Sequence, residues 1–172
     1  MASRTLVSVE EYLRTSYRPD CDYVDGEIVE RNLGELDHSD LQSEISAYFR
    51  SRRKKLGVFA YVEQRVQVSP TRFRIPDVCV LVGDRPTEQV FRTPPFIAIE
   101  ILSRDDRISQ MQERIDDYLN FGVRYVWLID PRTRRAWIHT TAGSHESQDG
   151  ILRTEDPAIE LPLPEIFHAL ES

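Results

Sequence analysis

The chain has 172 residues, of which 40% are hydrophobic and 30% are charged, and its formal net charge at pH 7 is −7. These values are typical of one globular domain, expected to span residues 1–172, with a core large enough to be stable without cross-links. No apolar run approaches the roughly 20 residues of a membrane span, and residues 1–7 lack the apolar stretch of a secretory signal, so we expect a cytoplasmic protein with no membrane association.

A short helix and a β-hairpin are predicted near the start of the chain. Residues 8–11, Ser-Val-Glu-Glu, form a capping box, and the helix that follows carries Tyr12 and Leu13 on its apolar side. Asp25 and Gly26 stand between two runs of β-forming residues, which is a strong signal for a two-residue hairpin turn.

A long helix is predicted from about residue 37 to residue 56, where Gly57 stops it. His38 falls on its apolar face, which is formed by Leu41, Ile45, Tyr48, Phe49 and Leu56. The helix ends in a dense group of cations, which are Arg50, Arg52, Arg53, Lys54 and Lys55.

A second, smaller group of cations comes later in the chain and consists of Arg132, Arg134 and Arg135. The net charge argues against a general attraction to nucleic acid, but local positive surface can still bind it. Each group is therefore either such a surface or, more simply, a solvated helix end or a polar hairpin turn.

The middle of the chain is predicted to be β. Over residues 62–68 three valines alternate with polar residues, as in one half-buried strand. The run at residues 74–82 is apolar on both faces beyond Asp77, and the run at residues 96–102 is apolar on both faces except for Glu100. Strands of this two-sided kind belong at the centre of a covered sheet.

A second long helix is predicted from about residue 105 to residue 121, with Gly122 as its stop. Its apolar face consists of Ile108, Met111, Ile115, Tyr118 and Leu119. A strand at residues 124–130 turns at Pro131 into another at residues 136–139, and a short closing helix follows the prolines near the C-terminus. Helices on both sides of a central mixed sheet make an α/β sandwich.

Glu100 is the most informative residue for function. Its strand neighbours are isoleucines, so its carboxylate loses hydration unless a cation or strong donors replace the water. Asp77 is placed in the same way on the other two-sided strand, and the two acids could share one Mg²⁺ or Mn²⁺ ion. Alternatively, Glu100 forms a buried structural ion pair with an arginine, either Arg74 or Arg114.

These stretches resemble the PD-(D/E)-x-K nuclease superfamily and, more closely, the Uma family of restriction-endonuclease-like proteins, long known as a domain of unknown function. The resemblance runs from about residue 8 to about residue 170 and depends on the order and spacing of residues 23–27, 38, 76–78, 100–103 and 121–131. It implies a restriction-endonuclease-like fold, with a central mixed β-sheet flanked by helices. It also favours metal binding by Asp77 and Glu100 over the ion pair.

The chain departs from the superfamily at the catalytic lysine. The superfamily has a lysine two residues after the strand acid, where this chain has Leu102. In the Uma family the resemblance places that lysine on the following helix, at the position of Arg114. Arg114 lies at the edge of the predicted apolar face, so it can reach the sheet. Arginine cannot accept a proton from water, but it can hold a phosphate oxygen or stabilise transition-state charge.

Two further residues, His38 and Glu27, match positions of the resembled family. His38 could contact phosphate or polarise a water, or it could be a satisfied core histidine. Glu27 could be a supporting metal ligand by way of a water, or a structural turn carboxylate. Glu44, on the first long helix, is a weaker candidate for the acid that many superfamily members supply from that helix.

Other catalytic schemes find no support in the sequence. There is no Walker-type phosphate loop and no nucleophile elbow, and the four histidines and two cysteines have no zinc spacing. Cys79 lies in an apolar run and is interpreted as a buried thiol in a reducing compartment.

The leading hypothesis is a Mg²⁺-dependent endonuclease acting on DNA. Asp77 and Glu100 would hold the ion, and Arg114 would take the usual role of the lysine. The alternatives are a nuclease-fold protein without catalysis that binds nucleic acid or a protein partner, and a structural subunit of a homodimer.

Overall fold

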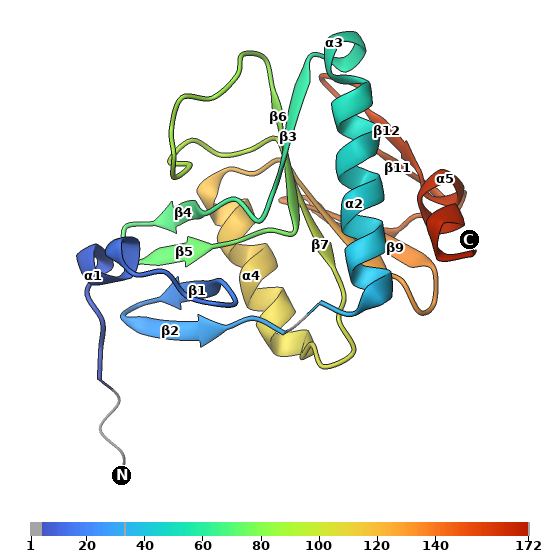
Figure 1. The fold of residues 1–172 in the computed structure, drawn as a ribbon. Coiled ribbons are helices and arrows are strands. Elements are labelled where there is room, and N and C mark those ends of the chain that lie inside the picture. The colour runs from blue at the N-terminus through green and yellow to red at the C-terminus, as the bar shows by residue number, and fades with distance from the viewer. Residues whose placement is uncertain (1–4, 33, 172) are drawn as a thin grey trace.

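The computed structural model describes residues 5–32 and 34–171. Its centre is a six-stranded mixed sheet in the order β10-β9-β8-β7-β6-β3. Helices α2 (Leu36–Ser51) and α4 (Ile108–Phe121) lie on opposite sides of it (Figure 1). Its strands are β3 (Val58–Val62), β6 (Val78–Val82), β7 (Ile97–Ile101), β8 (Tyr125–Asp130), β9 (Arg135–Thr140) and β10 (Gly143–Glu146). The predicted fold class, a central mixed sheet flanked by helices, is confirmed.

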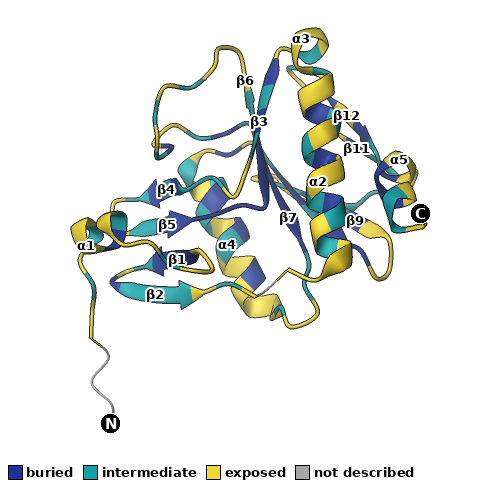
Figure 2. Cartoon of the chain, in the orientation of Figure 1, coloured by how far each residue is buried: buried dark blue, intermediate teal, exposed yellow. Residues whose placement is uncertain are grey.

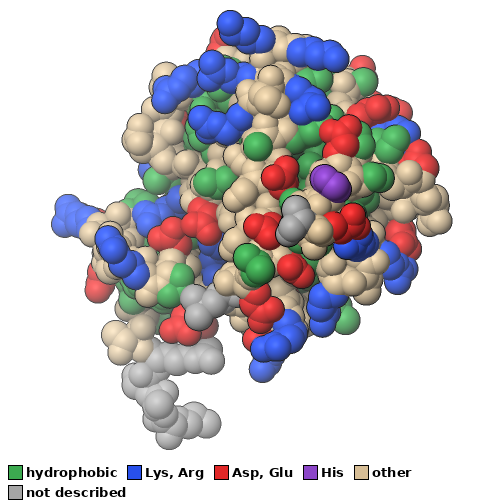
Figure 3. Space-filling view, turned by 45° about the vertical axis from the view of Figure 1, so that its right-hand side comes forward, with side chains coloured by type: hydrophobic (Ala, Val, Ile, Leu, Met, Phe, Trp, Pro, Cys, Tyr) green, Lys and Arg blue, Asp and Glu red, His purple; other side chains and the backbone are tan. Residues whose placement is uncertain are grey.

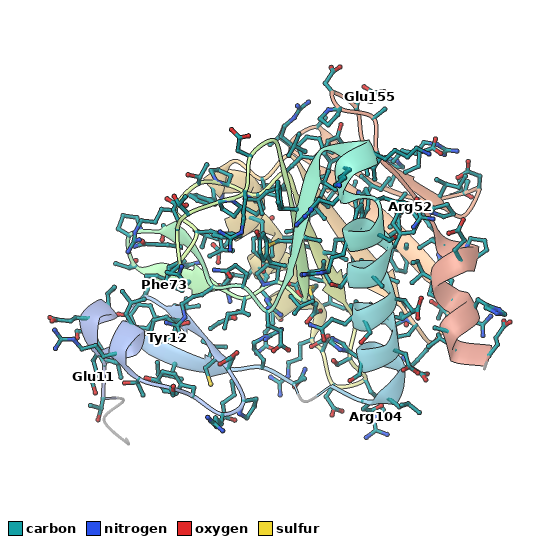
Figure 4. All side chains as sticks on the ribbon, turned by 45° about the horizontal axis from the view of Figure 1, so that its top comes forward. Glu11, Tyr12, Arg52, Phe73, Arg104 and Glu155 are labelled. Atoms are coloured by element: carbon teal, nitrogen blue, oxygen red, sulfur yellow. The ribbon has the colours of Figure 1, made fainter. Side chains whose placement is uncertain are left out.

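A second sheet lies beside the first and has the order β2-β1-β5-β4. Its strands are β1 (Cys21–Val24), β2 (Glu27–Glu30), β4 (Val66–Ser69) and β5 (Arg72–Arg74). Helix α1 (Val9–Arg14) packs on this sheet through Tyr12, whose ring lies 5.2 Å from that of Phe73 (Figure 4). The C-terminal part consists of β11 (Ile151–Arg153), β12 (Glu160–Pro162), α5 (Leu163–Phe167) and the 3₁₀ helix His168–Glu171.

Two hydrophobic cores cover the two faces of the large sheet (Figure 2). Helix α2 contributes the buried residues Leu41, Ile45 and Phe49 to one core, and helix α4 contributes Met111, Ile115 and Tyr118 to the other. All five residues of β7 are buried, as expected for a two-sided central strand. An acid in β7 is therefore held in the interior of the molecule.

The predicted helix cap, hairpin turn and helix stop are all present in the structure. Ser8 Oγ accepts a hydrogen bond from the backbone N–H of Glu11 at 3.1 Å. Asp25 and Gly26 have φ angles of 49° and 94° and join β1 to β2 in the two-residue turn that such sequences favour. The left-handed residue Gly122 ends α4 as predicted.

Several predicted boundaries are wrong. Residues 62–68 are not one strand, because Glu63 adopts a positive φ of 48° and turns the chain from β3 of the large sheet toward β4 of the small one. The predicted helix over 37–56 breaks at Arg52 into α2 and α3 (Arg53–Leu56). The second helix begins at Ile108, whose side chain is 90% exposed rather than part of the apolar face.

None of the helices in the described part of the chain is long and apolar enough to cross a membrane. The predicted lack of a secretory signal involves residues 1–4, which lie outside the described residues.

Candidate active site

Asp77 and Glu100 come together at the centre of the large sheet. β6 and β7 are antiparallel, with Val78 paired to Ile99, and Asp77 and Glu100 are the next residues in that register. Asp77 directly precedes β6, and Glu100 lies within β7. Both acids are buried, at 3% and 1% exposure. The carboxylate of Asp77 is contacted by His38 of α2, and that of Glu100 by Tyr118 and Arg114 of α4. The charge of Asp77 still acts on the pKa of Glu100.

Asp77 is held by two basic side chains and by the backbone. Its Oδ1 accepts a hydrogen bond from Arg31 Nη2 at 2.9 Å, and its Oδ2 accepts one from the N–H of Ile101 at 2.7 Å. His38 Nε2 lies 3.3 Å from the same Oδ2. Burial favours the neutral acid, but the hydrogen bond and charge of His38, together with Arg31, hold the pKa of Asp77 below its usual value. Asp77 is therefore an anion at neutral pH.

Glu100 has a different environment. Its Oε1 accepts a hydrogen bond from the hydroxyl of Tyr118 at 2.7 Å and lies 3.3 Å from Arg114 Nη2. Burial raises the pKa of Glu100 to about 8; the Arg114 charge opposes this rise, and the neighbouring Asp77 charge adds to it. Two interacting carboxyl groups whose pKa values are moved in opposite directions are typical of functional sites.

Arg114 connects Glu100 to a third buried acid. Its Nε lies 3.4 Å from Asp22 Oδ2, and its Nη2 donates to the carbonyl of Ile75 at 3.1 Å. The prediction that Arg114 reaches toward the sheet is confirmed, and the ion pair between Glu100 and Arg114 that the sequence offered as an alternative is present. Arg74, the other arginine considered as a partner of Glu100, pairs instead with Asp22 and Asp117.

Two neighbouring cavities share Arg31 and Asn32 as lining residues, and Glu100, at 1% exposure, lines neither of them. One cavity of ≈ 400 Å³ is lined by Asp77 and His38, and the other, of ≈ 250 Å³, by Arg114 and Asp22. Between the two cavities, the side-chain amide of Asn32 donates a hydrogen bond to Asp106 Oδ1 at 2.6 Å. At the N-terminal end of α2, Arg104 forms an ion pair with Glu35 at 3.6 Å (Figure 4).

Three cationic groups around the acids have buried nitrogen atoms without a hydrogen-bond partner among the described residues. These atoms are Arg31 Nε, His38 Nδ1 and Arg114 Nε, and the last of them lies 3.4 Å from the carboxylate of Asp22. Leaving a buried donor unsatisfied costs about 1–3 kcal/mol, so these positions favour an anionic ligand with several acceptor oxygens. A phosphate group has that chemistry.

The donor set also fits a divalent cation in part. Mg²⁺ commonly binds through one or two carboxylates and completes its shell with water and substrate phosphate, and Asp77 and Glu100 supply two buried carboxylates that interact electrostatically. Within residues 5–32 and 34–171, no group of three or more His, Cys, Asp or Glu side chains is arranged to hold a metal. A metal would therefore depend on this pair and on non-protein oxygens, and it would displace the contacts with Arg31 and Arg114.

The remaining candidates lie at different distances from the pair. His38 contacts Asp77 directly. Glu27 lines the Arg114 cavity. It lies four residues before Arg31, which is about 13 Å along an extended chain. Its role as a water-mediated metal ligand remains a prediction. Glu44 is exposed on α2 and lines neither of the two cavities.

Sequence reasoning missed Arg31, Asp22 and Tyr118 as parts of the site. Asp22 follows a cysteine in β1, and Tyr118 resembles an ordinary core aromatic on its helix. Arg31 contacts an acid 46 residues away. The only local signal was Asp22 itself, an acid inside a buried strand like Glu100.

The pair of His38 and Asp77 predicts a pH-dependent stability. Burial lowers the pKa of His38, but the hydrogen bond and charge of Asp77 outweigh burial, so the pKa is raised above its ordinary 6.5. The stabilisation is therefore complete below pH 6.5 and is lost as the pH rises through the folded-state pKa. It is also lost in strong acid, where Asp77 becomes protonated.

His38→Gln keeps a donor for Asp77 but removes the charge. In EDTA, we expect the native protein to exceed the variant in free energy of unfolding by about 1–2 kcal/mol near pH 5.5, and the difference to vanish near pH 9. Urea denaturation across this range is the measurement. A difference that stays constant with pH would contradict the charged pair.

Comparison with known proteins relates this chain to a protein family and to a solved structure. A family model described as "Uma2: Putative restriction endonuclease" matches residues 9–171. The fold is similar to the crystal structure of "a putative nuclease belonging to DUF820" from Anabaena variabilis ATCC 29413, with a TM-score of 0.83, 23% identity and coverage of 95% of this chain and 99% of that chain. A search of curated proteins found no match.

Proposed function

The chain belongs to the Uma2 family, and on that basis we propose that it is a metal-dependent endonuclease that hydrolyses phosphodiester bonds, with DNA as its substrate. The observation that supports this proposal best is the pair of buried acids, Asp77 and Glu100, surrounded by the basic groups of Arg31, Arg114 and His38, of which Arg31 Nε and His38 Nδ1 have no hydrogen-bond partner among the described residues. Carboxylates for a cation and donors for a phosphate are thus combined in one place.

The side chains divide the chemistry between them. Asp77 and Glu100 are the residues that would hold Mg²⁺ or Mn²⁺, which when bound supplies an activated water and stabilises charge on phosphate. Arg114, fixed by Asp22 and the Ile75 carbonyl, would bind a phosphate oxygen and stabilise the developing charge. Arg31 and His38 would turn from Asp77 toward the phosphate as the cation enters. Since arginine replaces the lysine of the resembled family, no general base is offered at that position and slow turnover is expected.

Nicking of supercoiled plasmid tests the proposal. We expect purified protein to convert supercoiled plasmid to the open-circular form in Mg²⁺ but not in EDTA, and Asp77→Asn to lower the rate by about 100-fold or more. Asp130→Asn is the matched control, because Asp130 is also a buried acid at the end of a strand but only holds the turn at Arg132 and Thr133. Equal loss in both variants, or nicking that persists in EDTA, would count against the site.

A second function is favoured by one observation. Arg31 and Arg114 already neutralise both acids, and no lysine lies near them. A nuclease fold that binds nucleic acid or a protein partner without cleaving it is consistent with this arrangement, and it predicts DNA binding with no nicking in any divalent cation. The homodimer and the cytoplasmic location expected from the sequence remain predictions.

A further inference from the structure

A hollow of ≈ 510 Å³ lies at the end of α2 that is far from Asp77. Its lining includes half-buried Phe59 and Tyr61 of β3, an edge strand of the large sheet, and four cations, which are Arg50, Arg53, Lys54 and Arg85. Among the described residues, no acid lines it. In Figure 3, Lys and Arg side chains gather at the top of the molecule, where Figure 1 places α3, while acidic side chains gather lower on that face.

These four cations are uncompensated, unlike those of the second basic group. Within the described ranges, Arg53 contacts the ring of Phe59 and Arg85 contacts a backbone carbonyl, and none of the four pairs with a carboxylate. In the second group every arginine has an acidic partner, with Arg132 beside Asp130, Arg134 beside Glu171 and Arg135 beside Glu146. A chain of net charge −7 therefore keeps one concentrated, unneutralised positive surface, which an anion would stabilise.

One flank of α2 connects this surface to the candidate active site. At about 100° per residue, the flank consists of Ser39, Gln42, Ser46 and Arg50, and the acids of α2 lie on the other side of the helix, at Asp37, Asp40 and Glu44. Ser39 and Gln42 line the Asp77 cavity, and Arg50 lines the basic hollow. At 1.5 Å per residue, Arg50 is about 18 Å from His38, which is about five base pairs of duplex DNA.

The aromatic rings in the hollow are already engaged. The guanidinium of Arg53 lies over Phe59 at 5.3 Å, and Tyr61 makes an edge contact with Phe91 at 5.6 Å. Base stacking needs a free ring face, so the hollow is suited to phosphates rather than to unpaired bases.

We propose that this basic hollow, lined by Arg50, Arg53, Lys54 and Arg85, binds the phosphate backbone of duplex DNA about five base pairs from the bond presented to Asp77 and Glu100. This inference rests on the proposed function for the identity of its partner. It assigns the first of the two basic groups to the substrate and leaves the second as a structural, acid-paired surface.

The test is DNA binding without cleavage. Anisotropy of a fluorescein-labelled 20-base-pair duplex, titrated in EDTA at several KCl concentrations, gives the Kd and its salt dependence. For the triple variant Arg50→Gln/Arg53→Gln/Lys54→Gln we expect affinity at 50 mM KCl to fall at least about tenfold and the slope of log K against log salt to become shallower by about 3, near 0.9 per lost phosphate contact. The control is Arg132→Gln/Arg134→Gln/Arg135→Gln, which makes the same change in net charge and should bind like the native protein.

The outcomes separate this inference from the proposed nuclease activity. Equal weakening in both triple variants, no duplex binding by the native protein, or tighter binding to single strands than to duplex would overturn the basic hollow as a duplex site. Duplex binding that depends on the first triple but comes with no nicking in Mg²⁺ would support the hollow and remove the nuclease. Where nicking is observed, the first triple should raise the DNA concentration for half-maximal rate and leave the saturated rate unchanged, since none of its residues lines the Asp77 cavity.

Discussion

Saturating Mg²⁺ or Mn²⁺ is expected to raise the melting temperature of the native protein by about 5–10 °C, and Glu100→Gln is expected to abolish that rise. At a metal concentration about 100 times Kd, binding to the folded state adds about 2.7 kcal/mol, and each kcal/mol shifts the midpoint of a chain of this size by about 2–4 °C. The measurement is best made near pH 8.5, where Glu100, with a pKa raised to about 8 by burial, is ionised.

The stability of Glu100→Gln without metal is the second part of this prediction. A glutamine at position 100 can still accept the hydrogen bond of Tyr118, and it removes a buried charge beside Asp77, so Glu100→Gln in EDTA should be as stable as the native protein or more so. Asp130→Asn should keep the full metal response, because Asp130 lies outside the site. If metal has no effect and Glu100→Gln is strongly destabilised, the structural ion pair with Arg114 is the better account.

Replacing Arg114 should separate a catalytic from a structural role. Arg114→Ala leaves Asp22 and Glu100 buried without the cation between them, and removing one partner of a buried pair costs about 3–5 kcal/mol. Arg114→Lys keeps the charge and introduces the residue that the resembled family uses. We expect slow plasmid nicking by the native protein, faster nicking by Arg114→Lys and none by Arg114→Ala.

Loss of folding must be separated from loss of chemistry in this series. The double variant Arg114→Ala/Glu100→Gln removes both charges, so urea denaturation should show part of the stability restored while nicking stays absent. Arg107→Ala, an exposed arginine at the start of the same helix, should change stability by less than about 0.5 kcal/mol. Equal nicking by the native protein, Arg114→Lys and Arg114→Ala would reject the catalytic role. An inactive Arg114→Lys that still binds metal would favour the non-catalytic binding protein.

The predicted parts of the fold are those whose causes are local. The capping box at residues 8–11, the Asp25-Gly26 turn and the stop at Gly122 each depend on hydrogen bonds or φ angles within a few residues, so a single sequence suffices to find them. The predictions failed where the same local sequence pattern is compatible with two different tertiary arrangements. The alternation over residues 62–68 is equally compatible with one strand or two, and the turn at Glu63 was decided by pairing with two different sheets.

The sequence by itself determined the fold class, because two-sided apolar strands belong at the centre of a covered sheet. It also singled out Asp77 and Glu100 as candidates, and the structure buries both. Only the tertiary structure decided what surrounds them. Arg31 donates a hydrogen bond to Asp77, which lies 46 residues away in the sequence. Tyr118 donates to Glu100, although it belongs to an otherwise ordinary apolar face of its helix. The tertiary structure also distinguished the two basic groups. Whether an exposed arginine is neutralised depends on which acid the fold brings beside it, and this is a property of long-range packing.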